Sequence, residues 1–220
     1  MERNPRKRNV TPVRRYDSSR RRAQADQNRA AVIEAARARF FADGYASTTV
    51  GQIAGDAGVS VETIYKAFGN KAGLLKAVFD VAVAGDDEPV AMADREFVAQ
   101  IQAEPDARRK LELYVAHLCD SMPRATPVQL LAREAGAADP DAAGVYAETR
   151  AEQLAGMTLF ARNLHETGQL RVSVTEARDV LWTYFAAEVY ELLVLERGWS
   201  TKRYGRFLAE AVIAALVGPS

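Results

Sequence analysis

The chain has 220 residues, of which 48% are hydrophobic and 26% are charged, so it can bury a sizeable core, and long disorder is excluded for most of its length. A single cysteine, Cys119, excludes an intramolecular disulfide and a metal site built from several thiolates. Without a run of 18 apolar residues or an apolar signal segment, we expect a soluble protein of a reducing compartment with no membrane span.

The net charge of zero averages two unlike regions. Residues 1–78 hold 15 Lys and Arg against 7 Asp and Glu, whereas residues 79–220 hold 14 against 22. This asymmetry indicates that the basic region meets a polyanion, with a basic tail on an ordinary globule as the alternative. Arginines concentrate in residues 1–25, which we expect to form a flexible arm along phosphates or in a minor groove. A merely solvated tail remains the alternative for this arm.

Helical periodicity begins near residue 27 and predicts a first helix that ends at Gly44. Thr49 and Gln52 have the spacing of a capping box, in which two side chains satisfy the free amides at a helix start. The sequence therefore predicts a short second helix that begins at Val50.

The next segment has the pattern of two short helices joined by a tight turn. Gly58 supplies the positive φ that the turn needs, and Ser60 caps a third helix over residues 61–68. The small side chain of Ala54 lets the two helices cross closely, and Ile64 fills the angle between them. This predicts a helix-turn-helix over about residues 49–68, with a generic helical hairpin as the alternative.

A longer motif contains this pattern: Gly44-Tyr45-Ala46-Ser47-Thr48-Thr49-Val50, Ile53-Ala54, Ala57-Gly58-Val59-Ser60, Thr63-Ile64-Tyr65, Phe68 and Asn70-Lys71-Ala72-Gly73-Leu74-Leu75. It resembles the DNA-binding domain of the tetracycline-repressor (TetR/AcrR) family over about residues 27–81. The resemblance implies an all-α bacterial transcriptional regulator that is a cytoplasmic homodimer, associated with the nucleoid when bound. It also implies a head over residues 26–85, with a connecting helix from Lys71, and an effector-binding and dimerisation domain over residues 86–220.

The resemblance assigns two groups of DNA contacts. The expected base-contacting residues, on the helix over 61–68, are Val61, Glu62, Thr63 and Lys66. The expected phosphate-contacting residues are Thr49, Ser60, Tyr65 and Lys71. Glu62 has an alternative role, because an anion in the first turn of a helix interacts favourably with the positive end of the helix dipole. The alternative role of Tyr65 is that of a half-buried structural aromatic.

Proline and cap residues divide the second domain. Pro105 is expected as the first residue of one helix, and Pro123 and Pro127 as the ends of a loop. Further on, three helices are expected, the first from Asp139-Pro140 to Gly168, the second from Ser173 to Gly198 and the last from Ser200.

The last helix carries an unbroken apolar stripe at helical spacing, which predicts one buried face. In the TetR family the final helix pair forms a four-helix bundle across the dimer axis, with an intramolecular core as the alternative here. The residues expected at the dimer interface are Leu192, Tyr204, Phe207, Leu208, Ala211, Val212 and Ala215.

The effector pocket is expected to be largely apolar. Its candidates are Tyr114, His117, Met122, Met157, Phe160, Trp182 and Phe185, each with an ordinary core position as the alternative. With only two histidines and one cysteine, the sequence has neither a metal-ligand spacing nor a nucleophile–base pair, so we expect no enzyme, metal or cofactor.

Two functions fit the sequence. The first is a ligand-responsive regulator, expected to be a repressor, whose homodimer binds a near-palindromic site on double-stranded DNA. A small apolar or amphipathic effector is expected to release it from the DNA. The second is an architectural or protein-interaction DNA binder without a small-molecule ligand.

Overall fold

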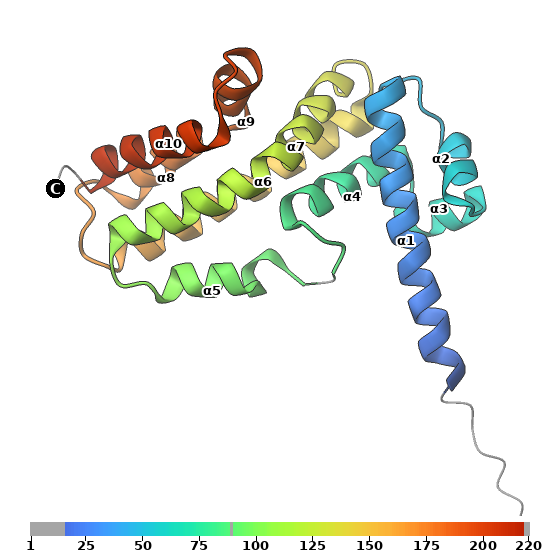
Figure 1. Ribbon diagram of the computed structural model, residues 1–220, viewed down its shortest axis with the longest axis horizontal. Coiled ribbons are helices and arrows are strands. Elements are labelled where there is room, and N and C mark those ends of the chain that lie inside the picture. Colours follow the sequence, from blue (N-terminus) through green and yellow to red (C-terminus); the bar gives the residue numbers. More distant parts are fainter. Residues whose placement is uncertain (1–15, 89, 218–220) are drawn as a thin grey trace, which may run out of the picture.

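The computed structural model describes residues 16–88 and 90–217, and every regular element in these stretches is a helix (Figure 1). This confirms the expected all-α fold class. The elements are α1 (Tyr16–Asp43), α2 (Val50–Ala57), α3 (Val61–Phe68), α4 (Lys71–Ala84), the 3-10 turn η1 (Met92–Asp94), α5 (Glu96–Ala103), α6 (Ala107–Ala135), α7 (Pro140–His165), α8 (Val174–Tyr184), α9 (Ala187–Tyr190), the π-helical segment η2 (Glu191–Glu196) and α10 (Thr201–Leu216). None of the helices in the described stretches is long and apolar enough to cross a membrane.

The first four helices form a head at one end of the molecule, and α8 and α10 lie at the other end (Figure 1). Phe40, Ile53 and Ile64 are fully buried where α1, α2 and α3 meet. The same core continues into α6 at Val128 and α7 at Val145, and α4 packs against both of these helices. The head is therefore built directly onto the two long helices that lead to the other end.

The first helix starts earlier than its periodicity indicated. Residues 16–25, assigned from sequence to a flexible arm, belong to α1, while residues 1–15 of that arm lie outside the described residues. Arg, Ala and Gln, which dominate residues 20–25, are strong helix formers that extend a helix without any apolar face. The apolar period therefore located only the packed half of α1.

The predicted loop between Pro123 and Pro127 is wrong, because α6 runs through both prolines. A proline inside a helix lacks the N–H group and frees a carbonyl in the preceding turn. The carbonyls that lose their helical donors are those of Cys119 and Pro123, four residues before the two prolines. Pro123 is exposed, so water reaches this turn and lowers the cost of the missing bonds.

The predicted helix from Ser173 to Gly198 is divided in three. The side chain of Ser173 caps α8 as expected, but the chain leaves the helix at Phe185 and becomes extended at Ala186. The break lets Phe185 and Tyr190 both enter the core, while Glu191 reaches the side chain of Arg133 on α6 at 3.0 Å. Burial and a tertiary ion pair, neither of which is visible in local periodicity, decide this break.

Three of the residues expected at the dimer interface lie in the core of their own chain. Tyr204, Leu208 and Val212 are 0% exposed, and the Tyr204 hydroxyl donates to Sδ of Met122 at 3.4 Å. The apolar stripe of α10 is thus buried against α6 and α8, which is the alternative left open for it. Of the other four, Phe207 and Ala211 are half-buried, whereas Ala215 and Leu192 are exposed.

Candidate nucleic-acid interface

The two short helices of the head are fixed at both ends by local hydrogen bonds. The side-chain oxygen of Thr49 accepts from the amide of Gln52 at 3.2 Å, and the amide of Thr49 donates to Oε1 of Gln52 at 2.8 Å. Gly58 adopts the left-handed conformation with φ 66°, and Oγ of Ser60 accepts from the amide of Thr63 at 3.1 Å. Such caps satisfy amides that a helix start leaves free.

The packing residues predicted for the helix pair lie where the sequence placed them. Ala54 is 3% exposed and Ile64 is 0% exposed, so the crossing of α2 and α3 is closed on its inner side. With the left-handed turn at Gly58 this fixes the orientation of α3 relative to α2. The result is a helix-turn-helix.

The opposite face of α3 is open to solvent. It presents the four residues expected to contact bases and one expected to contact phosphate, namely Val61, Glu62, Thr63, Lys66 and Tyr65, all exposed. Val61 and Tyr65 are unusual among them, since these large apolar side chains are 40% and 51% exposed. An apolar group held in solvent on a rigid helix is typical of a binding surface.

The remaining residues expected at phosphates make bonds within the chain. The Thr49 hydroxyl donates to Oε1 of Gln52 at 2.9 Å. Nζ of Lys71 donates to the carbonyls of Tyr45 and Thr48 at 2.9 and 3.3 Å and lies 4.2 Å from the centroid of the Tyr45 ring. In this structure Lys71 therefore ties the start of α4 to the loop after α1, and its phosphate contact stays a prediction.

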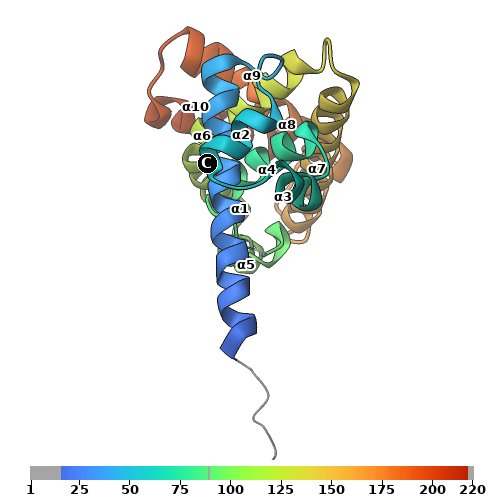
Figure 2. The same cartoon turned by 90° about the vertical axis from the view of Figure 1, so that its right-hand side faces the viewer.

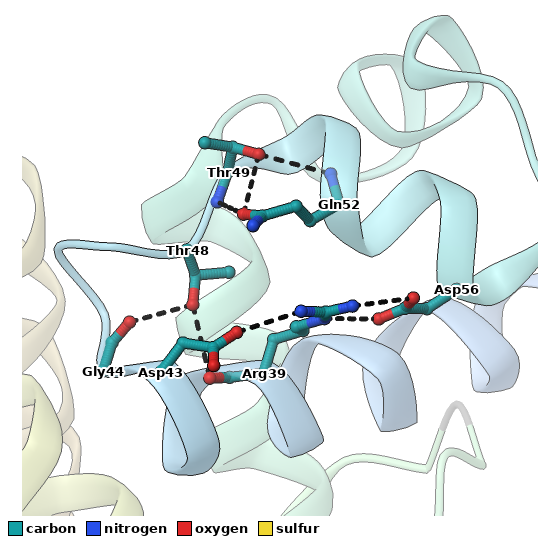
Figure 3. Close-up of polar contacts among 7 residues, drawn as sticks. All are labelled: Arg39, Asp43, Gly44, Thr48, Thr49, Gln52 and Asp56. Carbon is teal, nitrogen blue, oxygen red and sulfur yellow. Dashed lines mark hydrogen bonds and ion pairs between the residues drawn. The ribbon is translucent and has the colours of Figure 1, made fainter.

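Sequence reasoning missed an arginine that joins α1 to α2. Arg39 donates to Oδ2 of Asp43 at 3.0 Å through Nη1 and to Oδ1 of Asp56 at 3.0 Å through Nη2 (Figure 3). The guanidinium also holds the pKa of the Asp56 carboxyl below its usual value. The four-residue spacing from Arg39 to Asp43 is a sequence signal, but the bridge to Asp56 depends on how the helices cross.

A second missed contact joins the head to α7. Asn70 caps α4 as predicted, with Oδ1 accepting from the amide of Gly73 at 2.8 Å. Its Nδ2 also donates to Oδ2 of Asp141, in the first turn of α7, at 3.1 Å. One side chain therefore positions both the end of the α3–α4 turn and the start of a long helix.

Four of the seven residues proposed for an effector pocket stack on aromatic rings. Tyr114 stacks on Phe160 and Phe185, with ring centroids 4.4 and 5.3 Å away. His117 stacks on Phe97 at 3.7 Å, and burial lowers the pKa of its imidazole.

The other pocket candidates lie in the same core. Trp182 lies under the guanidinium of Arg150, whose Cζ is 3.9 Å from the ring centroid, and Met122 and Met157 are buried. Two surface hollows, one along α8 and one between α6 and α10, are lined by none of the seven. The pocket therefore stays a prediction. Among the described residues, no group of three or more His, Cys, Asp or Glu could hold a metal ion.

The head is similar in sequence to known proteins. A family profile described as "Bacterial regulatory proteins, tetR family" matches residues 32–78, which include α2, α3 and most of the packed half of α1. The HTH-type transcriptional regulator TtgR of Pseudomonas putida is 44% identical over 61 residues, which are 28% of this chain. The head is therefore similar to the TetR family. The match spans 29% of the length of TtgR, so it concerns the head alone.

Solved structures extend the likeness of fold to most of the chain. The fatty acid degradation regulator FadR of Bacillus halodurans has a TM-score of 0.67 at 21% identity, over 84% of this chain and 98% of its own. A candidate transcriptional regulator of Saccharomonospora viridis, solved in complex with choline, has a TM-score of 0.64 at 19% identity, over 87% and 98%. At these identities the shared property is the helical fold.

The capping box at the start of α2 gives a first prediction. Replacing Thr49 with alanine removes the oxygen that accepts from the amide of Gln52, and we expect the free energy of unfolding to fall by about 1 kcal/mol. Urea unfolding at fixed protein concentration measures the change. Ser47→Ala, at an exposed serine of the same loop, is the control and should change it by less than about 0.5 kcal/mol. Equal effects of the two substitutions would show that the box adds nothing.

Proposed function

We propose that this protein is a DNA-binding transcriptional repressor of the TetR family that acts as a homodimer. The observation that carries the proposal is the outer face of α3, where Val61, Thr63 and Lys66 are held in solvent by a capped and tightly packed helix pair. Lys66 can donate to guanine, and Val61 and Thr63 can contact a thymine methyl group. One such helix contacts few bases, so a two-fold pair of heads is needed for a near-palindromic site.

We further propose that the dimer uses the side of the molecule opposite the head. On α10, Phe207, Ala211 and Ala215 remain after its buried stripe is set aside, and Leu192 of η2 is 54% exposed. Association through this side leaves both heads at the other end of the molecule. The acidic net charge of residues 79–220 keeps that part of the protein away from DNA.

The effector in this proposal is a small apolar or amphipathic molecule that binds the second domain. Two of the structural neighbours point to such chemistry, since one was solved with choline and another is named for fatty acid degradation. A shift of α6 or α7 would reach the head through Val128, Val145 and the Asn70–Asp141 bond. An effector can release the DNA only to the extent that it binds the two arrangements of the heads with different affinity.

The test uses a duplex selected by the wild-type protein from a random DNA pool, and a scrambled duplex of equal length. We expect Lys66→Ala to reduce the preference for the selected duplex by about 1–3 kcal/mol per half-site, while binding to the scrambled duplex changes little. Fluorescence anisotropy at fixed salt measures both affinities. Lys202→Ala, at an exposed lysine of α10, is the matched control and should leave both unchanged.

Each contrary outcome has a separate meaning. Equal weakening on both duplexes would show that Lys66 contacts phosphate and not a base. If the wild-type protein selects no sequence and binds no duplex, the proposed function is wrong.

A further inference from the structure

The N-terminal half of α1 projects beyond the head. Among residues 20–43 of α1, those that are buried lie from Val32 to Phe40, and Figure 2 shows the helix running past α2 and α3 and continuing alone. Every residue from Arg20 to Gln27 is exposed. Arg29 ties α1 to distant parts of the chain, since its guanidinium carbon lies 5.0 Å from the centroid of the Phe68 ring and its Nε lies 3.1 Å from Oδ1 of Asp87.

Residues 20–27 of this projecting segment are not part of the buried core. Apart from Tyr16 and two alanines, residues 16–28 are polar. An isolated helix of this length is marginal in water, and a helix that is polar on all sides needs pairing or a polar partner to persist. The chemistry of its surface therefore decides which partner fits.

That surface is basic. Arg20, Arg21 and Arg22 are consecutive, so at about 100° per residue their side chains cover much of the circumference of one helical turn. Arg14 and Arg15 directly precede the helix in the sequence. Cations that are spread around a helix fit a partner with many negative charges. A single small anion bound in a pocket would need its cations on one side only, so the complementary partner is a polyanion.

The position of this basic turn relative to α3 identifies the polyanion. Arg29 contacts Phe68, the last residue of α3, and the turn lies seven to nine residues before Arg29 on the same rigid helix. At 1.5 Å per residue this is about 10–14 Å, or roughly three to four base pairs of duplex. When α3 lies on DNA, the turn is therefore within reach of the flanking sequence.

We propose that the basic turn of α1, Arg20–Arg22, binds the phosphates of the DNA that flanks each half-site. The inference rests on the proposed function, because it requires α3 to be on DNA. The turn supplies affinity and dependence on salt without specifying a base sequence, as phosphate contacts do. An acidic protein surface, such as that of a second copy, is the rival occupant.

The test compares two duplexes that carry the same selected site. One duplex ends at the edges of the site, and the other is extended by 10 base pairs of random sequence on each side. The variant is Arg20→Gln with Arg22→Gln, because glutamine has nearly the helix propensity of arginine and should keep α1 helical. Circular dichroism checks that the helix content is unchanged. The control is Arg162→Gln with Arg171→Gln, at two exposed arginines of the second domain.

We expect the wild-type protein and the control to bind the extended duplex more tightly and with a steeper dependence on salt. The variant should lose this difference on the extended duplex, with a log–log salt slope shallower by about 1.8 per protomer, and should match the wild type on the trimmed duplex. Over a fourfold change in salt, this slope difference is about twelvefold in affinity per protomer.

Three outcomes would overturn the inference. If the wild-type protein binds both duplexes with the same affinity and slope, the turn does not contact flanking DNA, although the proposed function stands. If the variant alters self-association without DNA, in sedimentation at fixed protein concentration, the turn binds protein. If the wild type binds neither duplex, the proposed function and this inference fail together.

Discussion

Replacing Lys110 with methionine is expected to lower the free energy of unfolding by about 2–4 kcal/mol. Lys110 is 2% exposed, and its ammonium donates to the carbonyls of Ile101 and Gln102 at 2.7 and 2.8 Å and to Oδ1 of Asn163 at 2.7 Å. These bonds join the end of α5 to α6 and α7. Methionine fills similar space but leaves three acceptors without their donor, and a buried acceptor left unpaired costs about 1–3 kcal/mol.

Chemical unfolding at a fixed protein concentration measures the Lys110 effect, since self-association would otherwise shift the midpoint. Arg109→Met is the matched control, because Arg109 is the preceding residue on α6 and its exposed side chain pairs only locally with Glu112. The control should change the free energy by less than about 0.5 kcal/mol. If Lys110→Met proves as mild as Arg109→Met, then water or a rearranged α5 satisfies the three acceptors and the lysine is not essential to the fold.

The head could be predicted from sequence because its decisive features are local. Thr49 and Gln52 form the capping box, and Gly58 takes the positive φ of the turn. Ser60 and Asn70 cap the next two helices as their positions indicated. Each of these features involves residues at most three positions apart, so the local sequence is enough to predict it.

The second domain was less predictable because its decisive features join distant residues. The stripe on α10 correctly indicated a buried face, but periodicity does not distinguish a partner in the same chain from a second copy, and Tyr204 and Leu208 pack internally. The break after α8 depends on the reach of Glu191 to Arg133, 58 positions away. The burial of Lys110 likewise depends on a distant residue, because its ammonium donates to Oδ1 of Asn163, 53 positions away.

The strongest test of how α3 is positioned is at Gly73, in the first turn of α4. A Cβ atom at this position would lie 1.9 Å from the carbonyl oxygen of Phe68, which is backbone at the end of α3. Real Cβ contacts do not come closer than about 3 Å, so the end of α3 must move by about 1 Å to admit a methyl group. The obstacle to alanine is steric and not conformational, because Gly73 lies within the regular helix α4, where the backbone accepts any L-residue.

We therefore expect Gly73→Ala to lower the free energy of unfolding by about 1–3 kcal/mol, as overpacking does. The same movement displaces Val61, Thr63 and Lys66 together, so the preference for a selected duplex should fall even at temperatures where the protein is fully folded. Gly144→Ala, within α7, is the matched control, since no heavy atom of the described residues outside its own helix backbone and chain neighbours lies within 4 Å of its added Cβ. There the substitution should stabilise the helix by up to about 0.5–1 kcal/mol and leave DNA binding unchanged. A Gly73→Ala protein that is as stable as the control and keeps its preference for the selected duplex would show that the turn between α3 and α4 yields easily, and that the orientation of α3 is set by its contacts with α2 alone.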